Sequence, residues 1–433
     1  MNQTILLSLF FVCLMTSCTV FYRTVRYGGA DIDDYNVFPT YDLNVNEYKF
    51  HFTKSDYKLF DTLDVNWDYQ GITYHNLDSL LENTSTRAFL IIKNDSIIYE
   101  NYFRGYKRED ISTVFSVSKS VTSLLIGIAI DEGYISSVND PVTKYISELK
   151  HADPMFDKLT IKDLLDMRSG IKFNEDYSFN PFSKIARLYY GRNQFSLVKR
   201  LTFECEPGTR QEYQSISTAI LGIVIEKATK QNFAKYFDDK VWKPLAMENT
   251  AKWSLDDKKH QSAKAYGGLS ISAIDLAKIG QLYLNDGKYN NTQIVSAKWV
   301  EETLTPNVYN DGYQSQWYSF CGNGLDSTGN KYFNDSITAQ KAWQVRYAKK
   351  YPYYEVSQVR KVDWNKKQQK KYWSLSRDNY WKLSIYTNQY YALGIMKQIL
   401  FIDPAKKTII VRLGDRSDFD NYTDLLYKIN KKL

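Results

Sequence analysis

Histidine is scarce in this sequence, with four residues among 433. None belongs to an H-E-x-x-H motif, in which two imidazoles one helical turn apart bind zinc. The four stand far from one another in the chain, at His51, His75, His151 and His260. The sequence therefore predicts no metal site.

Cysteine is equally rare, and two of the four residues, Cys13 and Cys18, lie close to the N-terminus. The other two, Cys205 and Cys321, are 116 positions apart. That separation fits neither a metal-binding motif nor a disulfide-dense framework. A single bridge between them stays open as an alternative, although two buried thiols fit the composition better.

Long apolar runs are also absent, since the longest at the N-terminus, Ile5–Met15, is too short to span a bilayer. It resembles the core of a signal peptide and ends in small residues before Cys18, like the lipobox of bacterial lipoproteins. We predict a signal peptide at 1–17, a lipidated Cys18, a tether at 18–43, and an exported protein anchored at the periplasmic side or outer surface. Plain secretion and an uncleaved anchor are the alternatives. Cys18→Ser would then release the protein from the membrane fraction.

The remaining composition, 43% hydrophobic and 15% aromatic, is typical of a globular protein, here one large domain over 44–433. Alternating apolar residues around turns predict two β-hairpins, and capped apolar stretches predict helices between them. The hairpins are expected at 87–106 and 398–414, and the helices at 112–133, 160–170, 217–229 and 271–287. A mixed α/β fold follows, with an antiparallel sheet whose strands come from both ends of the chain.

One segment, 340–382, differs from the rest in charge. It holds 12 Lys and Arg against three acidic residues, together with ten Trp and Tyr. We interpret it as part of an insert at about 321–388. It is expected to be a solvated lid, or alternatively a surface that binds acidic glycans. Its positive charge would also suit binding to nucleic acid. Because an exported protein is not expected to meet nucleic acid, no such partner is predicted.

The stretch "SVSK" places Ser116 and Lys119 three residues apart, on one face at the start of the apolar helix. A helix N-terminus favours developing negative charge, and a desolvated lysine loses proton affinity and becomes a base. The pair therefore has the chemistry of a nucleophile and its base. The spacing alone is weak evidence, because it recurs at Ser55, Ser147, Ser169 and Ser196.

A second stretch, "EYQSIS", places Tyr213 and Ser215 in a turn-rich region before another apolar helix. A nearby lysine cation would lower the pKa of a tyrosine from about 10 and make a phenolate base attainable. We therefore expect Tyr213 to have a lowered pKa beside Lys119.

These motifs, in this order, resemble those of the serine β-lactamase-like hydrolases over roughly 87–426. That family includes class C β-lactamases, penicillin-binding DD-peptidases, esterases and 6-aminohexanoate-dimer hydrolases. "SVSK" is similar to its nucleophile box and "YQS" to its second box. Further similar segments are "LLDMRSGIKFNEDY" (164–177), "VWKPLAME" (241–248) and "YGGLSISAIDLAKIGQLYLNDG" (266–287). The implied fold is β-lactamase/transpeptidase-like (α+β): an antiparallel sheet flanked by helices, plus a mostly helical domain.

The resemblance also implies residue roles. Ser116 would form an acyl-enzyme while Lys119 and Tyr213 exchange the proton as general base and acid. The backbone N–H groups of Ser116 and Ile395 would form an oxyanion hole. Substrate contacts would come from Ser215, more weakly from Tyr177, and from Ala392 and Gly394. No cofactor is implied.

The third box departs from the family pattern. β-Lactamases and DD-peptidases carry Lys-Thr-Gly or His-x-Gly there, whereas this chain has Ala392, Leu393 and Gly394. The cation that would hold a substrate carboxylate is missing. We therefore expect an amide or ester substrate without a carboxylate at that position. A DD-peptidase or β-lactamase, and a non-catalytic envelope binding protein on the same fold, are the alternatives.

Overall fold

The structure is a computed structural model of the chain. It describes residues 19–55, 64–177, 180–307, 312–323, 336–341, 356–361, 381–416, 419 and 422–433. The predicted signal peptide, Cys18 and most of the basic segment 340–382 lie outside the described residues. Within these ranges no helix has the length and apolar character needed to cross a bilayer.

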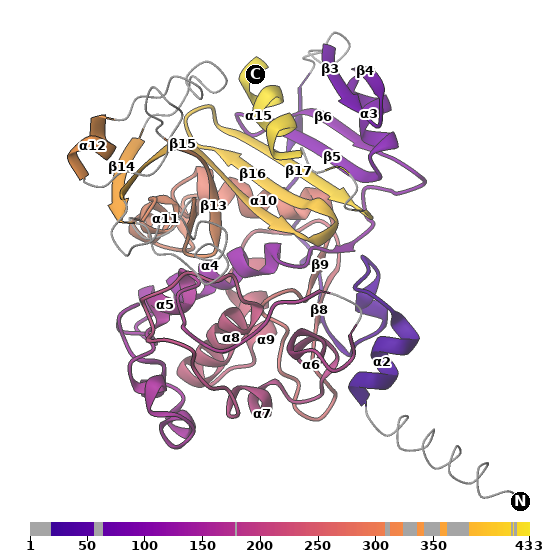
Figure 1. Cartoon of the computed structure of the whole chain (residues 1–433). Coiled ribbons are helices and arrows are strands. Elements are labelled where there is room, and N and C mark those ends of the chain that lie inside the picture. Colours follow the sequence, from indigo (N-terminus) through magenta and orange to yellow (C-terminus); the bar gives the residue numbers. More distant parts are fainter. Residues whose placement is uncertain are drawn as a thin grey trace, which may run out of the picture.

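A large sheet forms one half of the molecule (Figure 1). Its neighbouring strands pair antiparallel, except that β2 and β6 are parallel. The strands lie in the order β12 (Tyr313–Gln314), β13 (Trp317–Asn323), β15 (Trp381–Gly394), β16 (Gln398–Asp403), β17 (Thr408–Gly414), β5 (Thr86–Lys93), β6 (Ser96–Tyr102) and β2 (Thr53–Lys54), with β14 (Val356–Lys361) also on β15. Both expected hairpins are present, and the late one pairs with the early one: Val411 lies opposite Leu90. The predicted sheet with strands from both chain ends is confirmed.

Helices cover both faces of this sheet (Figure 1). Helix α10 (Ala273–Leu284) packs on one face, and α3 (Leu77–Asn83) and α15 (Tyr422–Lys432) on the other. The approach of α10 is close at Gly280, where an added Cβ would lie 3.0 Å from the side chains of Ile409 and Leu400. Each face therefore has its own apolar core.

The other half of the molecule is mostly helical, as the family resemblance implies (Figure 1). It contains α5 (Ile161–Leu165), α6 (Lys184–Tyr190), α7 (Gln194–Val198), α8 (Ser215–Thr229) and α9 (Phe233–Phe237). A small sheet in the order β1 (Thr40–Leu43), β8 (Ala251–Ser254), β9 (Leu269–Ile271) and β7 (Ser112–Thr113) adjoins it. Helix α4 (Val117–Asp131) contacts α8 on one side and the large sheet at β15 and β16 on the other.

Local chemistry explains the helix boundaries. Ser272 caps α10 by accepting a hydrogen bond from the Asp275 amide. Thr160 and Asp163 form a reciprocal capping box at the start of α5. Helix α5 ends at Leu165, earlier than the predicted 170, because Met167 adopts a left-handed φ of 56° that an α-helix does not accommodate.

The predicted tether is wrong for the part that the structure describes. Residues 19–43 contain helix α2 (Thr19–Tyr27), which packs on α6, and strand β1, which pairs with β8. Phe38 is buried against the rings of Tyr189 and Tyr190. These apolar contacts offset the loss of chain entropy that would otherwise keep a polar segment mobile.

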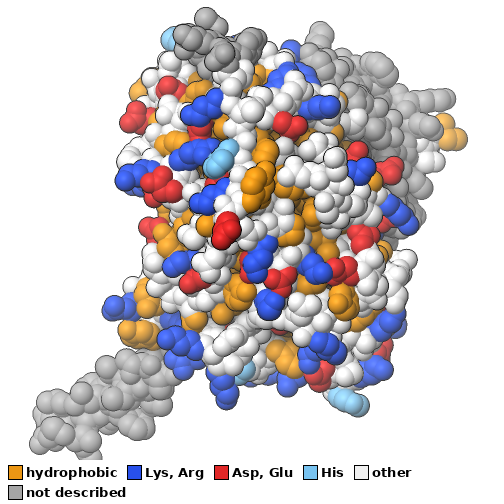
Figure 2. All heavy atoms as spheres, turned by 180° about the vertical axis from the view of Figure 1, so that it is seen from behind, with side chains coloured by type: hydrophobic (Ala, Val, Ile, Leu, Met, Phe, Trp, Pro, Cys, Tyr) orange, Lys and Arg blue, Asp and Glu red, His pale blue; other side chains and the backbone are white. Residues whose placement is uncertain are grey.

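The face of the molecule in Figure 2 shows basic and acidic side chains intermixed, without a large patch of one sign. The net charge of the whole sequence is +7, and the segment 340–382 alone carries an excess of nine basic residues. The positive charge of this protein is therefore concentrated in that segment rather than spread over the described surface.

Candidate active site

Ser116 lies directly before helix α4, in a strained turn. The preceding residue, Phe115, has a φ of 46°, a left-handed conformation that costs a non-glycine residue about 1–2 kcal/mol. Although Ser116 occupies the N-cap position, its side chain makes no capping hydrogen bond. Its hydroxyl instead lines the cleft described below. Such strain tends to be retained where a side chain must be aimed at a site.

Lys119 lies one turn into α4 and is 1% exposed. Its Nζ is 2.9 Å from Ser116 Oγ and donates a hydrogen bond to the carbonyl oxygen of Tyr266 at 2.8 Å. Burial lowers the pKa of Lys119 to about 8, and the carboxylate of Glu175 opposes part of that shift. At pH 7 about a tenth of this amine is then neutral and able to accept a proton, far more than for an exposed lysine.

Tyr213 comes from the loop before α8, and its hydroxyl lies near enough to the Ser116 side chain to interact with it. The Lys119 Nζ lies 5.1 Å from the centre of its ring. The structure thus brings together the two sequence-distant boxes. The expected lowering of the Tyr213 pKa is wrong, however, because burial raises that pKa well above its usual value. Tyr213 keeps its proton in the resting site.

Aromatic rings back this tyrosine and explain its desolvation. Tyr213 packs edge-on against Tyr313 at 5.8 Å, and Tyr313 against Tyr318 at 4.7 Å. Tyr318 in turn stacks on Tyr391 of β15 at 5.2 Å. The chain of rings ties the site to the edge of the large sheet.

The third box lies at the end of β15. A Cβ at Gly394 would come 2.3 Å from the Val114 carbonyl oxygen, so glycine permits the strand to approach the turn before Ser116. The next residue, Ile395, lines the cleft together with Ser116. Ala392 is 1% exposed and belongs to the apolar core, not to the residues that line the cleft. Of the predicted substrate contacts, neither Ala392 nor Gly394 is among the described residues that line this cleft.

Glu175 is a residue that the motif analysis missed, although it stands in the "NEDY" stretch that pointed to Tyr177. Its carboxylate accepts hydrogen bonds from the amide and hydroxyl of Ser215, at the start of α8. It also accepts one from the Tyr177 hydroxyl. Ser215 and Tyr177, two of the predicted substrate contacts, thus lie at the cleft but are bound to the same carboxylate.

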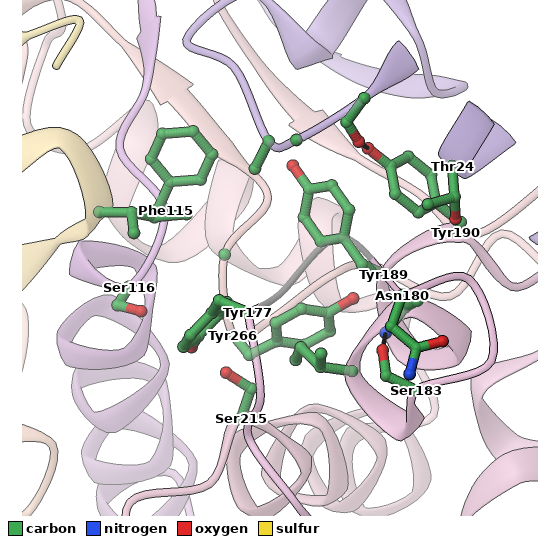
Figure 3. Close-up of a pocket in the computed structure, with 17 residues that line it drawn as sticks. Thr24, Phe115, Ser116, Tyr177, Asn180, Ser183, Tyr189, Tyr190, Ser215 and Tyr266 are labelled. Atoms are coloured by element: carbon green, nitrogen blue, oxygen red, sulfur yellow. Dashed lines mark hydrogen bonds between the residues drawn. The ribbon is translucent and has the colours of Figure 1, made fainter. Parts of the chain in front are cut away.

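A cleft of about 800 Å³, including its opening to solvent, begins at Ser116. Figure 3 shows Ser116 at one end and Tyr190 and Thr24 at the other, with Tyr177, Tyr266 and Tyr189 between them. None of the described residues that line it carries a charged side chain. Among the described residues, the groove next to the serine is therefore uncharged and lined in part by aromatic rings.

Other predicted features lie elsewhere. Cys205 is a half-buried free thiol, and the side chain of Cys321 lies outside the described residues. Within the described part of the chain, no group of three or more His, Cys, Asp or Glu side chains is placed to hold a metal ion.

Comparison with known proteins assigns the chain to a family. The Beta-lactamase family model matches residues 76–426, and the protein belongs to that family. Over 241 residues the chain is 30% identical to the 6-aminohexanoate-dimer hydrolase of Paenarthrobacter ureafaciens. This alignment covers 53% of the present chain and 59% of that relative. The chain spans about half the length of the curated relatives it matches.

Solved structures share the fold at low sequence identity. One, described as "Putative 6-aminohexanoate-dimer hydrolase from Bacillus anthracis", covers 91% of both chains with a TM-score of 0.66 and 20% identity. A class C β-lactamase covers 86% of this chain and 96% of its own, with a TM-score of 0.53 and 14% identity. The β-lactamase/transpeptidase-like fold is thereby confirmed for this member of the Beta-lactamase family.

Proposed function

We propose that this protein is an exported serine hydrolase that cleaves an uncharged amide or ester through an acyl-enzyme on Ser116. The observation that carries the proposal is the 2.9 Å separation of Lys119 Nζ and Ser116 Oγ at one end of an uncharged cleft. Nucleophile and base within hydrogen-bond reach are the geometric signature of covalent catalysis.

The reaction follows from the protonation states of the three side chains. Neutral Lys119 accepts the Ser116 proton as the serine oxygen attacks the substrate carbonyl carbon. The backbone N–H groups of Ser116 and Ile395 stabilise the resulting oxyanion. Tyr213, which retains its proton, donates it to the leaving amine or alcohol and is reprotonated from Lys119. Water then cleaves the ester bond to Ser116 by the same steps in reverse.

The uncharged cleft supports a substrate that has no carboxylate near the reacting bond. A carboxylate bound there would lose its hydration without gaining a cationic partner among the described lining residues. This argues against D-Ala-D-Ala peptides and β-lactams. Covalent labelling by a fluorescent penicillin would instead support the DD-peptidase alternative.

Export and lipidation at Cys18 remain part of the proposal, supported by the sequence of residues 1–18 alone. Acidic-glycan binding by 340–382 remains the alternative to a lid.

The test is active-site labelling with a fluorophosphonate, a neutral electrophile that modifies activated serines. We expect one adduct, on the peptide that contains Ser116, found by mass spectrometry, together with turnover of p-nitrophenyl acetate or butyrate. Labelling at another serine, with Ser116 unmodified, would refute the assignment. Heat-denatured protein is the control for non-specific reaction.

The pH dependence of kcat/KM gives a second test. Below a pH of about 8, Lys119 is increasingly protonated and cannot accept the serine proton, so activity should fall towards acid with a limb near that value. Glu175→Gln removes a negative charge that favours the ammonium form, so the limb should move to lower pH. pH profiles of p-nitrophenyl acetate hydrolysis measure the position of the limb in both proteins. Glu206→Gln is the control, because Glu206 is an exposed carboxylate paired with Lys158, and it should leave the limb unchanged. A limb that moves upward in Glu175→Gln contradicts the assignment.

A further inference from the structure

We propose that the segment Thr24–Ala30, at the end of helix α2 and in the loop after it, forms one wall of a subsite that binds an uncharged aryl or short alkyl group of the substrate. This rests on the proposed hydrolase function and adds the class of group that the enzyme selects. Helix α6, on which α2 packs, forms the adjoining wall.

The position of the segment in the cleft is the first observation. Thr24, Gly28, Gly29 and Ala30 line the same cleft as Ser116. In Figure 3 Thr24 and Tyr190 stand at the end remote from Ser116. Helix α6 contributes Ile185, Ala186, Tyr189 and Tyr190 from its own side. A substrate bound at Ser116 would therefore extend towards the end of the cleft where the two elements meet.

The wall is held in place by specific contacts. The Tyr190 hydroxyl donates a hydrogen bond to the Gly28 carbonyl oxygen at 2.9 Å, and Arg23 Nη1 donates one to the Tyr190 carbonyl oxygen at 3.1 Å. Further along, the Tyr189 hydroxyl donates to the carboxylate of Asp34, and Phe38 packs edge-on against Tyr189 at 5.3 Å. The subsite is thus largely formed before a ligand arrives.

These contacts also set its chemistry. The hydroxyls of Tyr189 and Tyr190 are bound to protein acceptors in the N-terminal segment, and that of Tyr266 donates to the Leu188 carbonyl oxygen. Their rings remain as apolar lining next to Ile185 and Ala186. With no charged side chain among the described lining residues, the subsite favours apolar groups and disfavours ionised ones.

The wall lies outside the family match, which begins at residue 76. The residues that form it are therefore not among those on which the family assignment rests.

The test compares p-nitrophenyl acetate with p-nitrophenyl 4-phenylbutyrate. Ala186→Phe on α6 and Ala30→Leu on the N-terminal wall each reduce the space between the walls. For both, kcat/KM of the larger ester should fall about tenfold or more relative to that of the acetate. Arg187→Phe, at the neighbouring exposed position of α6, should leave the ratio unchanged. An unchanged ratio in Ala30→Leu overturns the N-terminal wall, and unchanged ratios in both variants overturn the subsite.

Direct binding separates this inference from the proposed function. In calorimetry, Ser116→Ala protein should bind the neutral 4-phenylbutyramide at least tenfold more tightly than the cationic 4-phenylbutylamine. Adding Ala186→Phe should abolish the binding of the amide. Binding of the amide without hydrolysis of any ester by the unmodified protein would support the subsite and refute the hydrolase. Equal affinity for both compounds would overturn the subsite, even if the esters are hydrolysed.

Discussion

Ser116→Ala is expected to lower kcat/KM for p-nitrophenyl esters by about 10⁴-fold or more, and Lys119→Met nearly as much, as is found where nucleophile and base act as a unit. The hydroxyl is weakly nucleophilic unless its proton has an acceptor, and Lys119 Nζ is the amine within reach at 2.9 Å. Methionine suits the buried position because it fills similar volume without a charge. Initial rates and thermal unfolding of each variant provide the measurement.

The double variant discriminates this mechanism from a merely structural role. Because the two residues act in one step, the effects of the two substitutions should not add. The kcat/KM of the double variant Ser116→Ala/Lys119→Met should lie within a few-fold of that of the slower single variant. Ser123→Ala is the matched control, a buried serine on the same helix whose hydroxyl has no hydrogen-bond partner within the described structure. Full esterase activity in Ser116→Ala would remove the nucleophile assignment.

Asp275→Ala is expected to reduce the free energy of unfolding by about 3–5 kcal/mol, the cost of removing one partner from a buried ion pair. Asp275 and Lys278 are both fully buried at the start of α10, with Lys278 Nζ 3.3 Å from the carboxylate. The same carboxylate accepts hydrogen bonds from the amides of Glu248 at 2.6 Å and Asn249 at 3.0 Å. Its loss would leave these donors unsatisfied.

Urea unfolding at fixed pH measures the effect. Adding Lys278→Met to Asp275→Ala should recover part of the lost stability, because the buried ammonium, which would otherwise keep the more distant Glu248 carboxylate at 3.6 Å, is then absent. Glu302→Ala is the control, since its pair with Lys298 is exposed and 3.8 Å apart, and such pairs contribute little. A loss below about 1 kcal/mol in Asp275→Ala would show that water or a neighbouring group replaces the carboxylate.

The sheet could be predicted from sequence because its strands carry local signals. The runs at 87–106 and 398–414 alternate around recognisable turns, and each became a hairpin. The segment 19–43 has no such signal. Its order comes from Phe38 and α2 packing on residues about 150 positions later, and long-range burial of this kind is invisible in a polar, aperiodic stretch.

The site was predictable where it depends on spacing along one helix. Ser116 and Lys119 meet because residues three apart share a helix face, and Tyr213 was placed near them by its motif. Glu175 and the wall at Thr24–Ala30 were missed because they reach the cleft only through tertiary packing. The direction of the Tyr213 pKa shift was wrong for the same reason, since the surrounding rings determine its hydration.

The pairing of Leu90 with Val411 has a consequence for how this protein matures. During synthesis the early hairpin leaves the ribosome with its β5 edge unpaired, and it must wait for nearly the whole polypeptide before β17 arrives. Contacts between such distant positions form slowly, and an unpaired edge invites association with other chains meanwhile. A nascent chain interrupted before β17 would therefore be prone to aggregate, and the proposed activity would arise only once β17 has been made.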